Sequence, residues 1–322
     1  LMSKVDTDMD VRKAIEHCAE DGIRADVWAE MIPEGLERFE KVRRFIRLHY
    51  QWLVLCDFLP SFVDQACIDA ALAGDPFGSD APIMPAEFSV AAYRFGHATV
   101  QPVYGISAQI PEAKLFDMAG FGPRSADWNM DMTLFFGPEA QRALPVGPNM
   151  AASLFALPPN IVGKGLTWGD IDIPLPQAAK LGLRNILRDR TAIQIPSGQQ
   201  VARALGLAEL PAPQALQDAH ITKTPLWFYC LQEAGEQGQG KLTGVGGTIV
   251  ASVIARLLKL DPESMLHIHG FQPWLGFGDH FSMASLMAYV DAHAGDVECA
   301  PALYCGPAHL ADDAGAPPIA AE

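Results

Sequence analysis

The sequence predicts a mainly α-helical protein, built as a single large helical domain with long irregular loops. Several segments place apolar residues at steps of three and four, the spacing of an amphipathic helix, and no alternating strand of any length occurs. Stretches rich in Pro and Gly, at 72–85, 101–126 and 138–176, are too long for tight connections between helices. Since no repeat or break in composition appears, we expect one domain over 1–305 and a poorly ordered Ala-, Gly- and Pro-rich tail over 306–322.

The first predicted helix is long and amphipathic. Pro33 lies at its start, as proline does in a first helical turn, and Pro60 is expected to end it. Because the run 52–55 is almost wholly apolar, the second half of this helix is expected to be buried on most sides. Its apolar positions are Leu36, Phe39, Val42, Ile46, Tyr50 and Leu53.

Five further helices follow along the chain. Pro102 lies just after the first of them, Thr224-Pro225 supplies a cap and a first-turn proline for the third, and Asp261-Pro262 ends the fourth. The five are predicted over 86–100, 177–190, 224–233, 248–260 and 281–293.

The charge balance excludes two classes of partner. Among 322 residues, 49% hydrophobic, the 38 acidic side chains outnumber the 23 basic ones, and the formal net charge is −15. Such a chain repels nucleic-acid backbones and anionic membrane surfaces, so we expect no nucleic-acid partner. The longest charge-free stretch, 143–163, contains four prolines, so no transmembrane segment is expected.

The cysteines indicate mostly reduced, buried thiols rather than a disulfide framework. Six of them are spread through the chain without C-x-x-C spacing, so neither a structural zinc site nor a set of bridges is indicated. Cys299 and Cys305 are close enough for a local bridge, but the pattern favours two unrelated residues. A cytoplasmic location is favoured, with secretion as the alternative if an upstream signal has been removed.

Two motifs that resemble binding sites have simpler interpretations. His267 and His269 would share one face of a strand, a legitimate metal-ligand spacing, but no third ligand is close in sequence. The segment Gly244-Val245-Gly246-Gly247 resembles a phosphate-binding loop, but no Gly-Lys-Ser/Thr follows it. Helix packing or a helix cap explains these glycines better.

His97 is the histidine whose surroundings point to a ligand. It lies among small residues in Ala91-Ala92-Tyr93-Arg94-Phe95-Gly96-His97-Ala98, which would let a broad flat ligand approach the backbone. Arg94 precedes it by one turn on the same helical face, and Asn185 and Arg188 are spaced alike on a later helix. The alternative is an interior histidine that donates to a backbone carbonyl, with Arg188 on a solvated face.

Four segments, in order, resemble the animal-type haem peroxidases, the peroxidase and cyclooxygenase superfamily, and its bacterial members in particular. Tyr93-Arg94-Phe95-Gly96-His97 is similar to the proximal-histidine signature of that family. The resemblance spans about residues 35 to 265. The other three segments are His49-Tyr50-Gln51-Trp52 through Asp57-Phe58-Leu59-Pro60; Leu183-Arg184-Asn185-Ile186-Leu187-Arg188-Asp189-Arg190 with Ile195-Pro196-Ser197-Gly198-Gln199; and Thr224-Pro225-Leu226-Trp227 through Gly247 and Leu260-Asp261-Pro262.

The resemblance implies a haem cofactor and assigns its residues. His97 would ligate the haem iron through one ring nitrogen, and its other N–H would donate to the side-chain oxygen of Asn185. Arg94 and Arg188 would hold the haem propionates. The implied reaction reduces hydrogen peroxide and oxidises a small organic donor.

The resemblance also leaves alternatives open. The family's dioxygenases carry a tyrosine three residues before the proximal histidine, where this chain has Arg94 with Tyr93 one place earlier, so a peroxidase is favoured over an oxygenase of fatty acids or other apolar substrates. The family's distal histidine, distal arginine and calcium loop lie upstream of the matched segments. We therefore expect this chain to be a carboxy-terminal portion, one chain of a two-chain enzyme, or a non-catalytic haem-binding module. His49 is not expected to replace the distal histidine.

Overall fold

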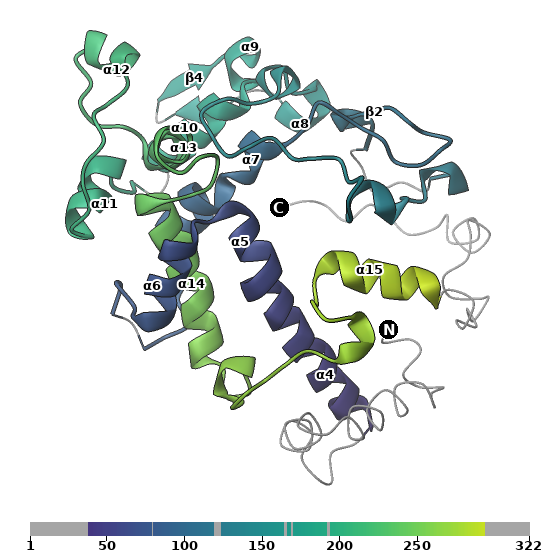
Figure 1. The fold of residues 1–322 in the computed structure, drawn as a ribbon. Helices are drawn as coiled ribbons and strands as arrows, with labels where there is room; N and C mark the ends of the chain where they lie inside the picture. The colour runs from purple at the N-terminus through teal and green to yellow at the C-terminus, as the bar shows by residue number, and fades with distance from the viewer. Residues whose placement is uncertain are drawn as a thin grey trace, which may run out of the picture.

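The computed structural model describes residues 38–78, 80–118, 124–163, 166–168, 170–191 and 194–293. These residues are mainly helical, as predicted, and their strands form two small ribbons (Figure 1). The longer α-helices are α4 (Arg38–Trp52), α6 (Gln65–Ala73), α10 (Leu181–Thr191), α11 (Gly198–Ala204), α13 (Leu226–Glu236), α14 (Gly244–Leu260) and α15 (Met283–Ala292). The predicted tail 306–322 lies outside the described residues, as do Cys18, Cys299 and Cys305. Of the described cysteines, all free thiols, Cys230 is buried but Cys67 is only partly buried and Cys56 is exposed, so the expectation of mostly buried thiols is wrong for these residues.

The first predicted helix does not stop at Pro60. α4 runs directly into the π-helix η1 (Leu53–Phe58) and then the α-helix α5 (Leu59–Phe62), and the chain becomes extended only at Val63. A π-helix pairs an N–H with the carbonyl five residues earlier, as the N–H of Leu59 does with Val54. Pro60 then lies in the first turn of α5, where its missing N–H costs little. The expectation that Pro60 ends the helix is therefore wrong.

Burial on most sides is confirmed for residues 52–55 of this helix but is wrong for the residues that follow. Leu53, Leu55 and Leu59 face the core, but Cys56 is exposed and Phe58 is 45% exposed. The apolar run itself is covered, since Trp52 and Val54 are partly buried and pack against the same core, so the exposure begins after Leu55. Sequence composition alone does not reveal which face stays open.

The other predicted helices are present with shifted ends. Residues 177–190 form two helices, α9 (Leu175–Ala178) and α10, rather than one. α13 and α15 lie where they are predicted, and α14 begins at Gly244, a turn before its predicted start. The long loops are confirmed, with the ribbons β1 (Val103–Tyr104) with β2 (Ala113–Lys114) and β3 (Leu166–Trp168) with β4 (Ile171–Ile173) within them.

The core is centred on α14, which packs against α6 and α13 (Figure 1). Glycines at its start make this close approach possible. A Cβ at Gly246 would lie 2.9 Å from Cβ of Cys230 on α13, and a Cβ at Gly247 would lie 2.7 Å from Sγ of Cys67 on α6. The buried Glu233 carboxylate accepts the N–H of Gly246 at 3.2 Å, so it caps this helix start. Packing and capping are thus the roles of the glycines, as expected.

A bidentate ion pair fixes the other end of α14. The guanidinium of Arg256, only 3% exposed, donates from Nε to Asp75 Oδ2 at 2.7 Å and from Nη2 to Asp75 Oδ1 at 2.8 Å. Asp75 follows α6, so the pair joins the two helices that pack most closely.

Asp75→Asn is expected to lower the free energy of unfolding by about 2 kcal/mol, because it leaves a buried guanidinium without its counter-charge. Urea denaturation measures this loss. Asp69→Asn, on the exposed side of α6, serves as the matched control and is expected to change stability by less than about 0.5 kcal/mol. Equal effects of the two substitutions would contradict a structural role for the pair.

His49, on α4, forms a hydrogen bond that links α4 to the segment before α15. Its ring is 4% exposed, and its Nδ1–H donates to the carbonyl of Phe45 at 2.8 Å, while its Nε2 accepts the backbone N–H of Trp274 at 2.9 Å. The rings of Phe45, Phe277 and Phe281 surround it with centroids 4.1, 5.6 and 5.2 Å away. This neutral, fully engaged imidazole is a packing residue, which agrees with the expectation that it does not replace a distal histidine.

Candidate functional site

The segment that carries His97 is helical but irregular. The single helix predicted over 86–100 is instead a π-helix, η2 (Glu87–Ala91), a 3-10 turn, η3 (Ala92–Arg94), and a short α-helix, α7 (Gly96–Thr99). The change of hydrogen-bond pattern occurs at Ala91, whose φ of −121° and ψ of −80° leave the helical region. Such π-type irregularities occur frequently at functional sites.

His97 and Asn185 are brought together although 88 residues separate them. The Asn185 amide lies 2.9 Å from Nδ1 of His97, and Asn185 is completely buried on α10. α10 also packs against η2, which holds the two segments in place. A buried amide thus fixes one nitrogen of a histidine ring that is itself only partly buried.

The two orientations of the Asn185 amide correspond to two tautomers of His97. The structure places Nδ2 toward the ring, so that the amide donates to Nδ1 and Nε2 carries the proton, the reverse of the predicted donation from His97 to the Asn185 oxygen. With Oδ1 toward the ring, Nδ1–H donates to the amide, and Nε2 keeps its lone pair. In the first orientation Oδ1 is buried and has no hydrogen-bond partner among the described residues. The second orientation is the one that permits metal ligation at Nε2.

Aromatic contacts fix the backbone around His97. The indole N–H of Trp227, on α13, donates to the carbonyl of Arg94 at 3.3 Å. Phe95 stacks on Phe62 with centroids 4.3 Å apart, and Tyr93 stacks on Phe88 at 4.5 Å. The sequence analysis does not predict this hydrogen bond of Trp227. It could have been sought because a buried tryptophan N–H requires a hydrogen-bond acceptor.

The predicted cation positions flank this pair. Arg94 is half-buried and ends the 3-10 turn, rather than sharing one continuous α-helical face with His97. Arg188 lies in α10 one turn after Asn185, and its side chain is outside the described residues. A Cβ placed on Gly96, next to His97, would meet no described atom within 4 Å. The small residue therefore leaves open space beside the histidine.

These residues could hold a metal-bearing group that needs one protein side chain. The described ranges contain no group of three or more His, Cys, Asp and Glu side chains that could hold an ion. A porphyrin iron needs a single side chain from this face, and His97 supplies one whose second nitrogen is already held. The space beside Gly96 and the cation at Arg94 are compatible with a planar, carboxylate-bearing ring system.

The second histidine motif of the sequence does not form as predicted. The expectation that His267 and His269 share a strand face is wrong, because His267 ends a 3-10 turn and its Nε2 contacts the carbonyl of Lys259 at 2.9 Å. The sequence also predicts surface positions for four histidines among polar or small neighbours; His220 and His293 are exposed, whereas His17 and His309 lie outside the described residues. The described residues also contain no helix long and apolar enough to cross a membrane.

Comparison with known proteins adds no relative to this description. A scan of the chain against models of protein families finds no match, and a search among curated proteins finds none either.

Proposed function

We propose that this chain is the haem-carrying portion of a peroxidase-type oxidoreductase, and that His97 ligates the haem iron. The observation that carries the proposal is the contact between His97 and the completely buried Asn185 amide, at 2.9 Å. A side chain that fixes the second nitrogen of a ligating histidine is a recurrent feature of metal sites. Bound haem would supply the redox chemistry, with hydrogen peroxide as the oxidant and a small organic molecule as the donor.

The chain's own residues would position the cofactor and set its electronics. Asn185, being neutral, would orient the imidazole without giving it the anionic character that a carboxylate partner gives. Arg94 and Arg188 would pair with the haem propionates. The contact between Trp227 and the carbonyl of Arg94 would hold the ligand-bearing segment in place. A distal histidine and arginine, and any calcium, would come from an upstream segment or partner chain.

The direct test of this activity is turnover with haemin and with the upstream chain supplied. Peroxide should then be consumed in proportion to the oxidation of an aromatic donor such as guaiacol, and His97→Ala should abolish the reaction. Uptake of oxygen with a fatty acid, and no reaction with peroxide and donor, would overturn the proposal in favour of the oxygenase alternative. Haem binding with neither reaction would favour a non-catalytic haem-binding module.

Asn185→Ala is expected to weaken haem affinity by about 10–100-fold, because residues that orient a ligating histidine typically contribute that much. Haemin titration followed in the Soret band measures the loss. Asn185→Asp is the matched variant, since it keeps an oxygen toward Nδ1 of His97. It is expected to retain more of the haem affinity than Asn185→Ala and to lower the Fe(III)/Fe(II) midpoint potential. An unchanged affinity in Asn185→Ala would contradict the assigned role.

A further inference from the structure

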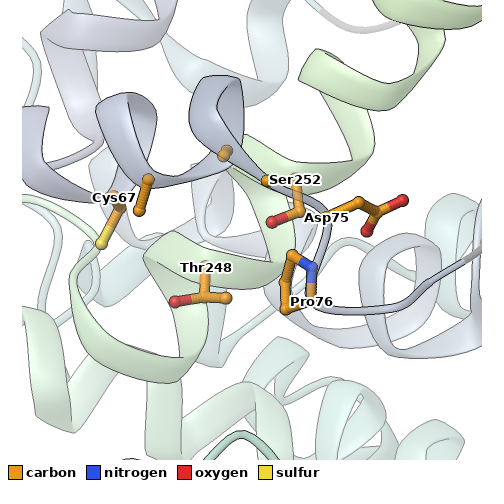
Figure 2. Close-up of a pocket in the computed structure, with 8 residues that line it drawn as sticks. Cys67, Asp75, Pro76, Thr248 and Ser252 are labelled. Carbon is orange, nitrogen blue, oxygen red and sulfur yellow. The ribbon is translucent and has the colours of Figure 1, made fainter.

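A pocket of about 360 Å³ opens between α6 and α14, lined by none of the residues of the candidate site. Figure 2 shows Cys67 on α6, Thr248 and Ser252 on the neighbouring α14, and Asp75 and Pro76 at one end. Ala70, which is exposed, lies at its rim. This volume lies within the range of sites that bind small molecules.

Ser252 presents an unpaired hydroxyl to this pocket. The residue is 2% exposed, and its Oγ has no hydrogen-bond partner in the part of the chain that the structure describes. A serine inside a helix commonly donates to the carbonyl four residues earlier, but this one does not. Buried polar groups in native proteins are nearly always satisfied, by protein, water or ligand. The hydroxyl is therefore the anchoring group that the pocket offers.

The lining of the pocket favours an uncharged occupant. Its one acidic side chain, Asp75, is neutralised by the bidentate pair with Arg256. Burial raises the pKa of the Cys67 thiol, and the nearby Asp64 raises it further, so the sulfur carries no charge at neutral pH. An anion would meet no free cation among the pocket's lining residues, and a cation would have to displace Arg256 from Asp75.

The apolar part of the lining favours a ring. Alanines form much of the α6 side, so little side chain fills the slot, and Pro76 closes one end with a flat apolar face. A neutral cysteine sulfur is a soft, polarisable neighbour for an aromatic edge. Thr248 also contributes a hydroxyl to the lining, but that hydroxyl is hydrogen-bonded to Cys67, so the unpartnered hydroxyl of Ser252 matches a ligand with one polar substituent.

We propose that this pocket is a second binding site, which takes a neutral aromatic alcohol of the phenol class. The hydroxyl of the ligand exchanges a hydrogen bond with Ser252 Oγ, and its ring lies between Pro76 and Cys67. The association is non-covalent and independent of the function proposed for His97.

The test uses the full chain and fluorine NMR. 4-Fluorophenol is expected to bind saturably, with at least tenfold weaker binding in Ser252→Ala. Fluorobenzene, which lacks the hydroxyl, should bind wild type and Ser252→Ala equally. 4-Fluorobenzoate and 4-fluorobenzylamine should bind at least tenfold more weakly than 4-fluorophenol.

A pair of α6 variants tests the location. Ala70→Phe should fill the rim of the pocket and abolish binding, whereas Ala66→Phe, also exposed on α6 but outside the lining, should leave binding unchanged. Thermal unfolding establishes that both variants are folded. Non-saturable binding by wild type, or equal affinity of wild type, Ser252→Ala and Ala70→Phe, would overturn the proposal.

Discussion

Gly198→Ala is expected to lower the free energy of unfolding by about 4 kcal/mol, or to prevent folding. A Cβ at Gly198, the first residue of α11, would overlap the ring and the Cβ of Tyr229. Tyr229 is fully buried on α13, and its hydroxyl accepts the N–H of Leu210 at 2.8 Å. The ring cannot move aside without breaking that hydrogen bond, so the added methyl group acts as overpacking at the severe end of its range.

Urea denaturation measures this effect, and Gly74→Ala provides the control. At Gly74 the nearest atom to a new Cβ is the carbonyl oxygen of Ala70 at 3.9 Å, an ordinary contact, and the backbone is extended. The control is expected to change stability by no more than about 0.5 kcal/mol. A Gly198→Ala protein as stable as the control would mean that α11 and α13 do not pack as described.

His49 is expected to make stability depend strongly on pH. Burial lowers its pKa from the ordinary 6.5 to about 4, although its hydrogen bond to Phe45 acts in the opposite direction. The unfolded chain therefore binds the proton more tightly, and the contribution to stability is lost as pH falls from 6.5 to 4. Since a tenfold change in proton affinity corresponds to about 1.4 kcal/mol, the loss amounts to about 3 kcal/mol.

Glu233 opposes this effect over part of the same range. Burial raises its pKa from 4.5 to about 7, while the N–H groups of Val245 and Gly246 lower it. The folded chain then binds the proton more tightly, so this contribution to stability grows as pH falls from 7 to 4.5. The contributions of His49 and Glu233 to the pH dependence of stability therefore partly cancel in the wild-type protein. Single substitutions are needed to separate them.

The measurement is the free energy of unfolding of wild type, His49→Gln and Glu233→Gln between pH 4 and 7.5. Gln at position 49 can donate to Phe45 and accept from Trp274 without titrating. The stability of wild type relative to His49→Gln should fall on acidification, and that relative to Glu233→Gln should rise. Two differences that change in the same direction with pH would contradict the assigned burial of these groups.

Most of the fold could be predicted from the sequence, because its helices are amphipathic or apolar along their length. The errors in the predicted helices arise where the backbone hydrogen-bond pattern changes from α to π or 3-10, because the spacing of apolar residues does not reveal such a change. Proline at position 60 predicts a helix end, but the π-helix before it lets the helix continue to Phe62. The segment around His97 is likewise predicted as one helix, but in the structure it consists of a π-helix, a 3-10 turn and a short α-helix.

The candidate site was less accessible to sequence analysis. Periodicity cannot pair His97 with Asn185 across 88 residues, and that pairing was expected only from the family resemblance. An interior histidine that donates to a backbone carbonyl is present at His49, where the sequence analysis did not predict one. The pocket at Ser252 could not be predicted from the sequence. The sequence does not reveal that this small polar residue in an apolar helix is buried, or that its hydroxyl lacks a hydrogen-bond partner among the described residues.

The most direct test of the central claim is haemin titration of wild type, His97→Gly and the exposed-histidine control His267→Ala. We expect wild type and His267→Ala to give an intense Soret band with the signature of histidine-ligated iron. His97→Gly should lose that signature and recover it when imidazole is added, because imidazole can occupy the space of the missing side chain. Indistinguishable spectra for all three proteins, or no specific haem uptake by wild type in the presence of the upstream chain, would contradict the assignment of His97 as the haem ligand.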